Sequence, residues 1–377
     1  MSYRADIAII GAGVIGLAIA SRVTRAGREV YVLEKNKTFG QEQSSRNSEI
    51  IHAGIYYEKD SLKAKTCLEG NSLLYQLCER NGIAYKKCGK IIVATSDIEA
   101  EKLEKLFERG NDNGVPLKML SQREMTRLEP NMKGIAAFFS PTTGIVDSYS
   151  LMRYFLGKAK ENGTQVVFKT EVTGIEKVSG GYEVSVDDPS GGFSFMTRVL
   201  VNCAGLYSDK VAEMAGINME EANYNLHWCK GEYYSVSGGK NRLINRLIYP
   251  VPMAISVGVH VCFDVNWRLR LGPLFYYVNE ISYKVDDSRK EAFLESSTVK
   301  ALPFIEPADL DPESAGIMAM LQGEGEGFRD FVIKHEYDRG LPGFINLVGI
   351  DTPGLTSSPA IARYVSHLVN EILESEK

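Results

Sequence analysis

The chain has 377 residues, of which 44% are hydrophobic and 24% are charged. This length suggests two or three structural units, and the composition excludes a mainly disordered chain. The formal net charge of −5 gives no basic field of the kind that nucleic-acid binding requires. No apolar run in the sequence is long enough to cross a bilayer.

The cysteines and the first residues bear on the compartment. The six cysteines form no C-x-x-C pair and have no zinc-site spacing, so we expect free thiols, no metal site and a reducing compartment. Residues 1–20 have the apolar run of a signal peptide, but Asp6 interrupts that run. We therefore predict a retained N-terminal strand and a cytoplasmic protein.

The first residues also predict a dinucleotide-binding unit. A β-branched apolar run at 5–10 is typical of a strand buried on both faces of a parallel sheet. It is followed by Gly11-Ala12-Gly13-Val14-Ile15-Gly16, by a helix expected at 17–26 and by a strand expected at 29–33. Glu34 ends this second strand. The order is strand, G-x-G-x-x-G, helix, strand and acid.

Each part of this motif has a physical role. Gly11 permits a tight turn, Gly13 lets the backbone approach a pyrophosphate, and Gly16 allows the helix to pack against the strand. The helix N-terminus offers free N–H groups and a partial positive charge to the phosphates. Glu34 follows the last glycine by about 20 residues, where its carboxylate can bind ribose hydroxyl groups. The motif therefore predicts FAD or NAD as ligand.

Three features favour FAD over NAD. The motif lies at the start of the chain and does not recur after a later strand. A hairpin expected at 170–186 leads into a strand at 198–202, which ends in Cys203-Ala204-Gly205. An apolar strand at 344–349 precedes a final helix, and the N-terminus of that helix, at Gly354-Leu355-Thr356, would stabilise negative charge on a reduced flavin.

The remaining sequence alternates between helical and extended patterns, so we predict an α/β fold. Helices are expected at 61–81, 97–113, 121–129 and 148–162, with Ser61 and Ser148 as N-caps, and strands at 89–95, 231–236, 247–251, 257–264 and 268–272. A Rossmann-like FAD-binding domain is expected from 1–81, 141–217 and 331–377. A second, α+β substrate domain built on an antiparallel sheet is expected from 82–140 and 218–330.

Short segments spread along the chain carry a resemblance to a known family. They are 44–57 (SSRNSEIIHAGIYY), 61–64, 140–147 (SPTTGIVD), 230–234 (KGEYY), 247–252, 258–260, 271–273, 330–333 and 353–356. They resemble the L-2-hydroxyglutarate dehydrogenases and oxidases of the D-amino-acid-oxidase-like flavoprotein superfamily. The resemblance covers nearly the whole chain. It implies a FAD domain with an antiparallel-sheet substrate domain, and oxidation of an L-2-hydroxy acid to the 2-oxo acid.

The resemblance also implies roles for individual residues. The segment Ser44–Ser48 would wrap the flavin, His52 would face its reactive side, and His260 and Lys230 would come from the substrate domain. The expected cofactor-binding residues are Gly11, Gly13, Val14, Ile15, Gly16, Glu34, Lys35, Ser44, Ser45, Arg46, Asn47, Ser48, Val172, Ala204, Gly205, Gly354, Leu355 and Thr356.

One segment departs from the family pattern. Relatives usually carry a glycine-isoleucine-arginine-proline-lysine segment, whose arginine can bind a substrate carboxylate. The matching residues here are Gly316-Ile317-Met318-Ala319-Met320. A thioether cannot replace a bidentate cation. Because of this departure, the sequence leaves open whether 2-hydroxyglutarate itself is the substrate. The expected reaction, oxidation of a hydroxy acid, depends less on this segment.

Oxidation of a secondary alcohol requires transfer of a hydride to flavin N5 and removal of the hydroxyl proton, a task that suits histidine. His52 and His260 are the catalytic candidates, because one follows the flavin-wrapping loop and the other lies in an otherwise apolar strand. The candidates for substrate binding are Tyr57, Lys230, Tyr233 and Arg270. Lys230 would hold a carboxylate, and Arg270 would replace the missing arginine.

Other functions remain open at this point. The same scaffold suits an amino-acid, amine or glycerol-3-phosphate oxidase, and it also suits a flavoprotein without turnover. We expect a small-molecule substrate, oxygen or a quinone as electron acceptor, and no nucleic acid. A peripheral membrane contact, the oligomeric state and covalent attachment of FAD stay open.

Overall fold

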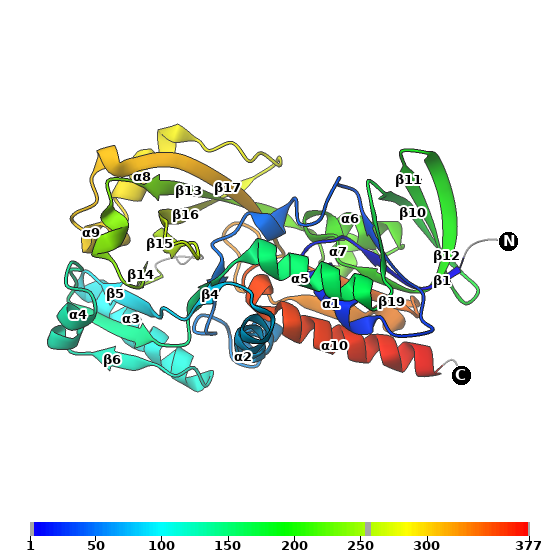
Figure 1. Cartoon of the computed structure of the whole chain (residues 1–377), viewed down its shortest axis with the longest axis horizontal. Helices are drawn as coiled ribbons and strands as arrows, with labels where there is room; N and C mark the ends of the chain where they lie inside the picture. The colour runs from blue at the N-terminus through cyan, green and yellow to red at the C-terminus, as the bar shows by residue number, and fades with distance from the viewer. Residues whose placement is uncertain (1–3, 253–257, 376–377) are drawn as a thin grey trace.

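The computed structural model describes residues 4–252 and 258–375. Its largest sheet has eight strands and lies in the half of the molecule that contains both termini (Figure 1). The strands are β1 (Arg4–Ile10), β2 (Val30–Glu34), β9 (Gln165–Phe168), β10 (Glu171–Val178), β11 (Gly181–Asp188), β12 (Gly191–Asn202), β18 (Val332–His335) and β19 (Phe344–Val348). The main path runs β10-β11-β12-β1-β2-β9, with β19 beside β12 and β18 beside β19.

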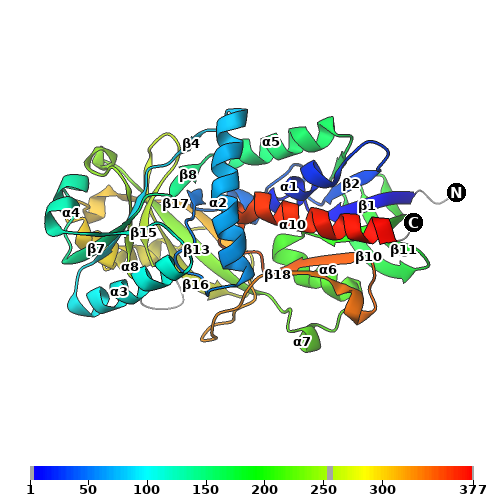
Figure 2. The same cartoon turned by 90° about the horizontal axis from the view of Figure 1, so that it is seen from below.

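Strand β1 is apolar because it lies buried in the middle of the sheet, as the sequence predicts. The strand pairs in parallel with β12 on one side and with β2 on the other. Ile7 and Ile9 have no exposed surface, because helices cover the sheet at this point. Those helices are α1 (Val14–Val23), α5 (Ser148–Glu161) and α10 (Gly354–Ser375), whose apolar residues share one core with β1. Figure 2 shows α10 running alongside α1.

The other half of the molecule contains two four-stranded sheets with a common apolar core. The first is antiparallel, in the order β15-β16-β13-β17, and consists of β13 (His227–Val236), β15 (His260–Phe263), β16 (Leu269–Val278) and β17 (Leu310–Met320). The second has the order β14-β5-β7-β6 and consists of β5 (Lys90–Ala94), β6 (Lys118–Leu120), β7 (Ala136–Ser140) and β14 (Leu247–Pro250). Four helices accompany them, namely α3 (Asp97–Asp112), α4 (Gln122–Leu128), α8 (Lys290–Leu294) and α9 (Ser297–Ala301).

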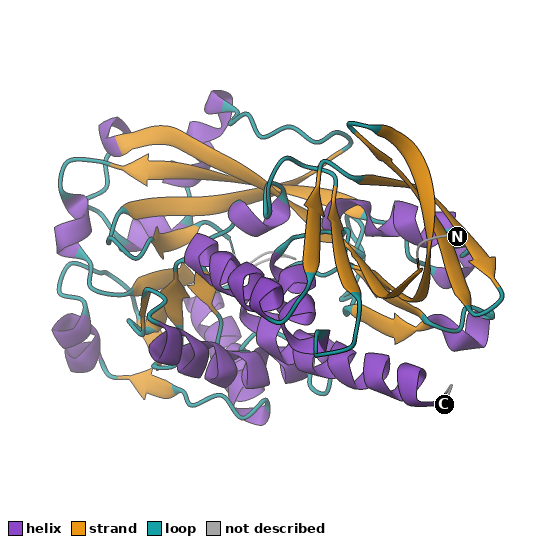
Figure 3. Cartoon of the chain, turned by 45° about the vertical axis from the view of Figure 1, so that its right-hand side comes forward, coloured by secondary structure: helices purple, strands orange, loops and turns teal. Residues whose placement is uncertain are grey.

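A small sheet and a long helix lie between the two halves. The sheet is formed by β3 (Ile50–Ile51), β4 (Tyr85–Lys86) and β8 (Gly144–Val146). Helix α2 (Leu62–Asn81) stands between the halves in Figure 2 and crosses the start of α10. The crossing is close, because a Cβ atom at Gly70 would lie 2.3 Å from the carbonyl oxygen of Thr356. Two short helices, α6 (Ser208–Met214) and α7 (Met219–Ala222), follow β12. Figure 3 shows that both halves combine strands with helices and that the chain ends in a long helix.

The α/β class and the antiparallel sheet agree with the sequence prediction, and two helix starts need correction. Helix α1 begins at Val14 rather than at 17, because the extended backbone of Gly13 already serves as its N-cap, and it ends where Thr24 becomes extended. Helix α5 is capped by Asp147, whose carboxylate accepts the Ser150 N–H, and not by Ser148. Ser61 caps α2 as predicted. Part of the strand predicted at 257–264 lies outside the described residues.

Several strands are longer than expected, since β16 continues to Val278 and β13 begins at His227. The eight-stranded sheet draws its strands from 4–34, 165–202 and 332–348, and the antiparallel sheet draws its strands from 227–320. The exact domain boundaries stay a prediction. Within residues 4–252 and 258–375, no helix has both the length and the apolarity that a membrane span needs. All six cysteines are free thiols.

Candidate active site

A cavity of about 460 Å³ lies where the first parallel strands end against the antiparallel sheet. Ligands of open α/β sheets bind at this carboxyl edge. One wall is formed by the glycine-rich turn after β1, the end of β2, the segment after β12 and the start of α10. The opposite wall is formed by side chains and backbone of the antiparallel sheet, namely Gly231, Tyr233, Phe275, Gly316 and Met318.

The glycine-rich turn is shaped by two close approaches. Gly11 has a φ of 104°, and a Cβ atom there would lie 2.5 Å from the carbonyl oxygen of Cys203. A Cβ atom at Gly16 would lie 2.0 Å from the carbonyl oxygen of Gly11. Gly16 does not line the cavity, and its close approach to Gly11 gives it a packing role, so its contact with the cofactor stays a prediction. Gly13 does line it.

The carboxylate of Glu34 links the glycine-rich turn after β1 to the residues that follow β2. One carboxylate oxygen accepts the Ala12 N–H at 2.8 Å, and the other accepts the Asn36 N–H at 2.9 Å. The side chain is buried but still lines the cavity. Each carboxylate oxygen has two lone pairs, so each can accept one more hydrogen bond. Glu34 can therefore order the glycine-rich turn and bind ribose hydroxyl groups at the same time.

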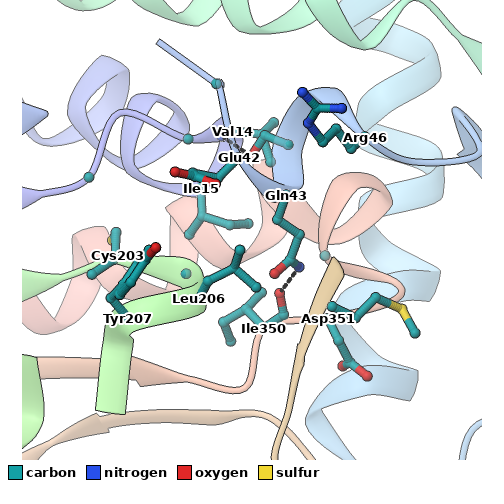
Figure 4. Close-up of a pocket in the computed structure, with 18 of the residues that line it drawn as sticks. Val14, Ile15, Glu42, Gln43, Arg46, Cys203, Leu206, Tyr207, Ile350 and Asp351 are labelled. Atoms are coloured by element: carbon teal, nitrogen blue, oxygen red, sulfur yellow. Dashed lines mark hydrogen bonds between the residues drawn. The ribbon is translucent and has the colours of Figure 1, made fainter. Parts of the chain in front are cut away.

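The loop before β3 connects the two halves of the molecule. The Gln43 amide donates to the carbonyl oxygen of Ile350 at 2.8 Å (Figure 4). Its oxygen accepts the Ala319 N–H at 3.2 Å, so one side chain links both walls. The guanidinium of Arg46 lies 3.9 Å from the ring centroid of Tyr283, and Nε of Arg46 is buried without a partner among the described residues.

The serines of this loop have different positions. The hydroxyl of Ser44 accepts the Val14 N–H at 3.0 Å, in the first turn of α1, and the hydroxyl of Ser48 lies 2.8 Å from that of Tyr233. Ser44, Arg46, Asn47 and Ser48 all line the cavity. Ser45 is exposed and does not line it, so its contact with the cofactor stays a prediction.

The first residues of α10 form part of the cavity wall. Gly354 and Leu355 line the cavity, whereas Thr356 does not. The hydroxyl of Thr356 accepts the His52 N–H at 3.0 Å and donates to the carbonyl oxygen of Ile50 at 3.1 Å. Thr356 therefore positions the segment that carries His52, and its contact with the cofactor stays a prediction. The remaining predicted cofactor residues Ile15, Lys35, Val172, Ala204 and Gly205 all line the cavity.

Of the two predicted catalytic residues, His52 lines the cavity and His260 does not. Its Nδ1 is buried and has no hydrogen-bond partner among the described residues. Burial lowers the pKa of His52 well below its ordinary value, and the nearby positive charge of Lys90 and the His260 ring lower it further. The imidazole is therefore neutral at pH 7 and has a lone pair that can take a proton.

His260 lies deeper, on the face of the antiparallel sheet that is turned toward the cavity. Its Nδ1 lies 2.9 Å from the carbonyl oxygen of Gly258, so Nδ1 carries the hydrogen and Nε2 is an acceptor without a partner among the described residues. Burial lowers the pKa of His260 to about 3. Its ring stacks on Tyr249 at 3.8 Å between centroids. His260 does not line the cavity.

Lys230 occupies the wrong face of its strand for substrate binding. Side chains alternate across a strand, and the neighbouring residues Gly231 and Tyr233 line the cavity. The ammonium group of Lys230 pairs with the buried carboxylate of Glu232 at 3.0 Å and donates to the carbonyl oxygen of Lys284. The prediction that Lys230 holds a substrate carboxylate is therefore corrected, because this charge is already neutralised.

The other predicted substrate residues lie around the same region. Tyr233 lines the cavity, and the guanidinium of Arg270 lies 5.5 Å from the centroid of the Tyr233 ring, with a carboxylate oxygen of Glu313 at 3.9 Å. Tyr57 is buried, and its hydroxyl has no partner among the described residues. Met318, which replaces the family's arginine, lines the cavity, and the hydroxyl of Thr352 lies 3.7 Å from its sulfur.

Sequence reasoning missed Lys90 and Tyr249, which lie beside the two histidines. Lys90 is 1% exposed, and its Nζ lies 4.3 Å from the ring centroid of Tyr249. One signal was available. Lys90 begins the otherwise apolar run KIIVA, and a charged residue in a strand that is fully buried needs a reason.

The residues of the cavity fit FAD. Helices α1 and α10 both begin at the cavity, so the positive ends of two helix dipoles face it. Gly13, whose lack of a side chain lets the backbone approach a pyrophosphate, lines the cavity beside the turn that Gly11 and Gly16 shape. Apolar residues such as Val14, Ile15 and Leu355 can cover flat rings.

Comparison with known proteins agrees with this assignment. Residues 6–368 match the DAO family, described as FAD dependent oxidoreductase. The chain is 35% identical to the mitochondrial L-2-hydroxyglutarate dehydrogenase of Arabidopsis thaliana, over 97% of this chain and 83% of the plant protein. It is 32% identical to the L-2-hydroxyglutarate dehydrogenase of Escherichia coli K12, over 79% and 69% of the two chains.

A glycerol 3-phosphate dehydrogenase of Caloramator mitchellensis is also 32% identical, over 97% of this chain and 74% of that protein. Among solved structures, L-alpha-glycerophosphate oxidase of Mycoplasma pneumoniae with FAD bound has a TM-score of 0.87 and 26% identity, over 97% and 95% of the two chains. Glycine oxidase of Geobacillus kaustophilus has a TM-score of 0.78 at 22% identity, over 98% and 95%, which shows the shared fold. The chain belongs to the DAO family of FAD-dependent oxidoreductases.

Proposed function

We propose that this protein oxidises a small L-2-hydroxy acid, of the 2-hydroxyglutarate type, to the 2-oxo acid. The full-length similarity to L-2-hydroxyglutarate dehydrogenases supports this substrate class. FAD, when bound, supplies a two-electron acceptor for the hydride that leaves the carbinol carbon. The observation that carries the proposal is a neutral, buried histidine, His52, in the wall of the FAD cavity.

His52 accepts the proton of the substrate hydroxyl in this proposal. A neutral imidazole with an unused nitrogen can act as a general base. Its backbone is held by Thr356 and by the side-chain amide of Asn71, which donates to the carbonyl oxygen of His52 at 2.9 Å. An anionic substrate beside the ring raises the pKa of His52 toward neutrality, which makes it a better proton acceptor in the complex than in the free enzyme.

Tyr233 orients the substrate from the opposite wall. The Tyr233 hydroxyl already shares a hydrogen bond with Ser48 and can donate to a substrate oxygen in its place. The sheet residues near Tyr233 exclude water, since His260 and its neighbours are buried. Arg270 lies behind the Tyr233 ring, where its charge favours an anionic ligand.

The test uses the purified flavoprotein without oxygen. L-2-hydroxyglutarate, L-lactate, glycerol 3-phosphate and glycine are added separately, and loss of the visible flavin band is followed. We expect the fastest reduction with L-2-hydroxyglutarate. His52→Ala should slow that reduction by at least about 100-fold while the FAD content stays the same. Reduction by none of the compounds would contradict the proposal.

Glycerol 3-phosphate is a second candidate substrate. The Caloramator relative and the Mycoplasma structure both carry glycerol phosphate names. Both compounds are anions with a secondary hydroxyl group, so the same base would serve. Fastest reduction by glycerol 3-phosphate in the same panel would establish this alternative and replace the first.

We also propose a cytoplasmic location and oxygen or a quinone as the acceptor. The six free cysteines support a reducing compartment. The Arabidopsis relative is named mitochondrial, so cell fractionation with an antibody is the relevant test. Reoxidation of the reduced enzyme by air or by a soluble quinone, followed at the visible flavin band, distinguishes the two acceptors.

A further inference from the structure

Lys90 is a buried cation without a counter-ion in the part of the chain that the structure describes. It is 1% exposed, and within residues 4–252 and 258–375 no carboxylate forms an ion pair with its Nζ. Its neighbours are the hydroxyl of Tyr56 at 3.1 Å and the rings of Tyr56 and Tyr249, with centroids at 4.5 and 4.3 Å. Burial of an unpaired ammonium group is costly, so the site needs an anion to complete it.

The surroundings of Lys90 contain further polar groups without partners among the described residues. These are the hydroxyl groups of Tyr57 and Tyr249 and the ring nitrogens His52 Nδ1 and His260 Nε2. The two ring nitrogens are acceptors, whereas the two tyrosine hydroxyls and the ammonium group together carry more donor hydrogens than these nitrogens can accept. Buried polar groups of folded proteins are normally satisfied. An excess of donors around one cation is the arrangement that binds a carboxylate.

This donor cluster adjoins the cofactor cavity through His52. His52 lines the cavity, and the charge of Lys90 is close enough to lower the pKa of both His52 and His260. Lys90 itself does not line the cavity, so it lies one layer farther from the cofactor than His52. A group that contacts Lys90 would therefore be at the far end of a substrate whose reacting carbon lies at His52.

We propose that the ammonium group of Lys90, together with the hydroxyl of Tyr249, binds the second carboxylate of a dicarboxylic 2-hydroxy acid, the one remote from the oxidised carbon. The inference rests on the proposed function and names the residue that selects its substrate. It also explains how the chain recognises a dianion without the family's arginine. The cation comes from β5, and position 318 on β17 is free to be methionine.

A binding experiment tests this site without any oxidation. Glutarate has both carboxylates and no hydroxyl group, and butyrate lacks the second carboxylate. We expect glutarate to raise the Tm of the FAD-loaded enzyme and to perturb its visible flavin band, with butyrate much weaker. Lys90→Met should weaken glutarate binding by at least about 30-fold. Lys65→Met, at an exposed position on α2, is the matched control and should bind glutarate like the wild type.

Kinetics provide a second readout. With L-2-hydroxyglutarate, Lys90→Met should raise KM far more than it lowers kcat. With L-2-hydroxybutyrate, which has no second carboxylate, kcat/KM should stay the same or rise. An equal loss with both acids would overturn the proposal, since a general structural defect affects both. Unchanged glutarate binding in Lys90→Met would overturn it as well.

Two other outcomes separate this inference from the proposed function. Glutarate that binds through Lys90 to an enzyme that oxidises neither acid would support the site and reject the function. Glycerol 3-phosphate that competes with glutarate and depends more strongly on Lys90 than glutarate does would show that the site takes a phosphate group, and would overturn the carboxylate assignment.

The pH dependence of glutarate binding distinguishes the charge of Lys90 from the charges of its neighbours. Burial lowers the pKa of Lys90 to about 7. The titratable groups of the cluster around it are His52, Tyr56, Tyr57, Cys67, Tyr249 and His260. Burial lowers the pKa of both histidines and raises the pKa of the three tyrosines and of Cys67, so all six are uncharged between pH 7 and 9.

Only the charge of Lys90 changes in this window within the cluster. Glutarate binding should therefore weaken by up to about tenfold for each pH unit above 7. Lys90→Met should remove this dependence. A wild-type affinity that stays constant over the same range would contradict the proposal.

Discussion

The ring of Tyr249 stacks on the imidazole of His260, with ring centroids 3.8 Å apart and ring planes 24° from parallel. The two residues belong to different sheets, since Tyr249 lies on β14 and His260 on β15. The stack and the Nδ1 contact with Gly258 fix both the orientation and the tautomer of His260. The position of His260 therefore depends on how the two four-stranded sheets pack together.

The buried His260 should make stability fall in mild acid. Burial lowers its pKa to about 3, so the unfolded chain binds a proton near pH 6.5 that the folded protein does not bind. A folded-state pKa below the unfolded value means that this stability is present above pH 6.5 and is lost as the pH falls. The expected slope is up to about 1.4 kcal/mol per pH unit.

Urea unfolding between about pH 7 and pH 5 measures this slope. His260→Gln should reduce the slope relative to the wild type, because its side chain does not titrate. His367→Gln, at an exposed position of α10, is the control and should leave the slope unchanged. Identical slopes for His260→Gln and the wild type would contradict the expectation.

Glu34→Gln should weaken FAD binding by about 10- to 100-fold. The amide keeps one acceptor oxygen and places an NH₂ group against one of the two backbone N–H donors, those of Ala12 and Asn36. Titration of the apo-protein with FAD gives Kd for each variant. Glu176→Gln, on the exposed side of β10, should match the wild type. Equal Kd values for both variants would argue against the role of Glu34.

Two glycine-to-alanine substitutions should have opposite effects. In Gly16→Ala the new Cβ would collide with the Gly11 carbonyl, so α1 must shift, and we expect loss of FAD and a lower Tm. Gly157 lies within α5, and a Cβ atom there would meet nothing within 4 Å. Gly157→Ala should stabilise the protein by about 0.5–1 kcal/mol. Thermal unfolding and FAD content measure both, and a Gly16→Ala variant that keeps FAD would reject the packing argument.

Lys230→Met should affect stability rather than substrate binding. It leaves the fully buried carboxylate of Glu232 without its cation, which should lower the free energy of unfolding by about 3 kcal/mol. KM should change less than about twofold. The measurements are urea unfolding and steady-state kinetics, with Lys65→Met as the exposed control. A large rise in KM at unchanged stability would return Lys230 to the substrate site.

Much of the cofactor site followed from local sequence. The turn after β1, the helix that follows it and Glu34 lie within one continuous segment, and their geometry depends on neighbours a few residues away. Glycines that must allow close backbone approach are visible as residue types. The cap of α2 at Ser61 is equally local, since the hydroxyl accepts an N–H three residues later.

The substrate side could not be predicted in the same way. Lys90, Tyr249 and His260 are distant in sequence and meet only because β5, β14 and β15 pack together. The face on which Lys230 lies depends on the register of β13, and a shift of one residue reverses every side chain of a strand. The sequence by itself determined the dinucleotide-binding motif, because short-range geometry encodes it, and it carried the resemblance to the family in short segments along the chain. Only the tertiary structure decided which charged side chains are buried and which of them are neutralised by ion pairs, because burial and ion pairing depend on contacts between distant strands.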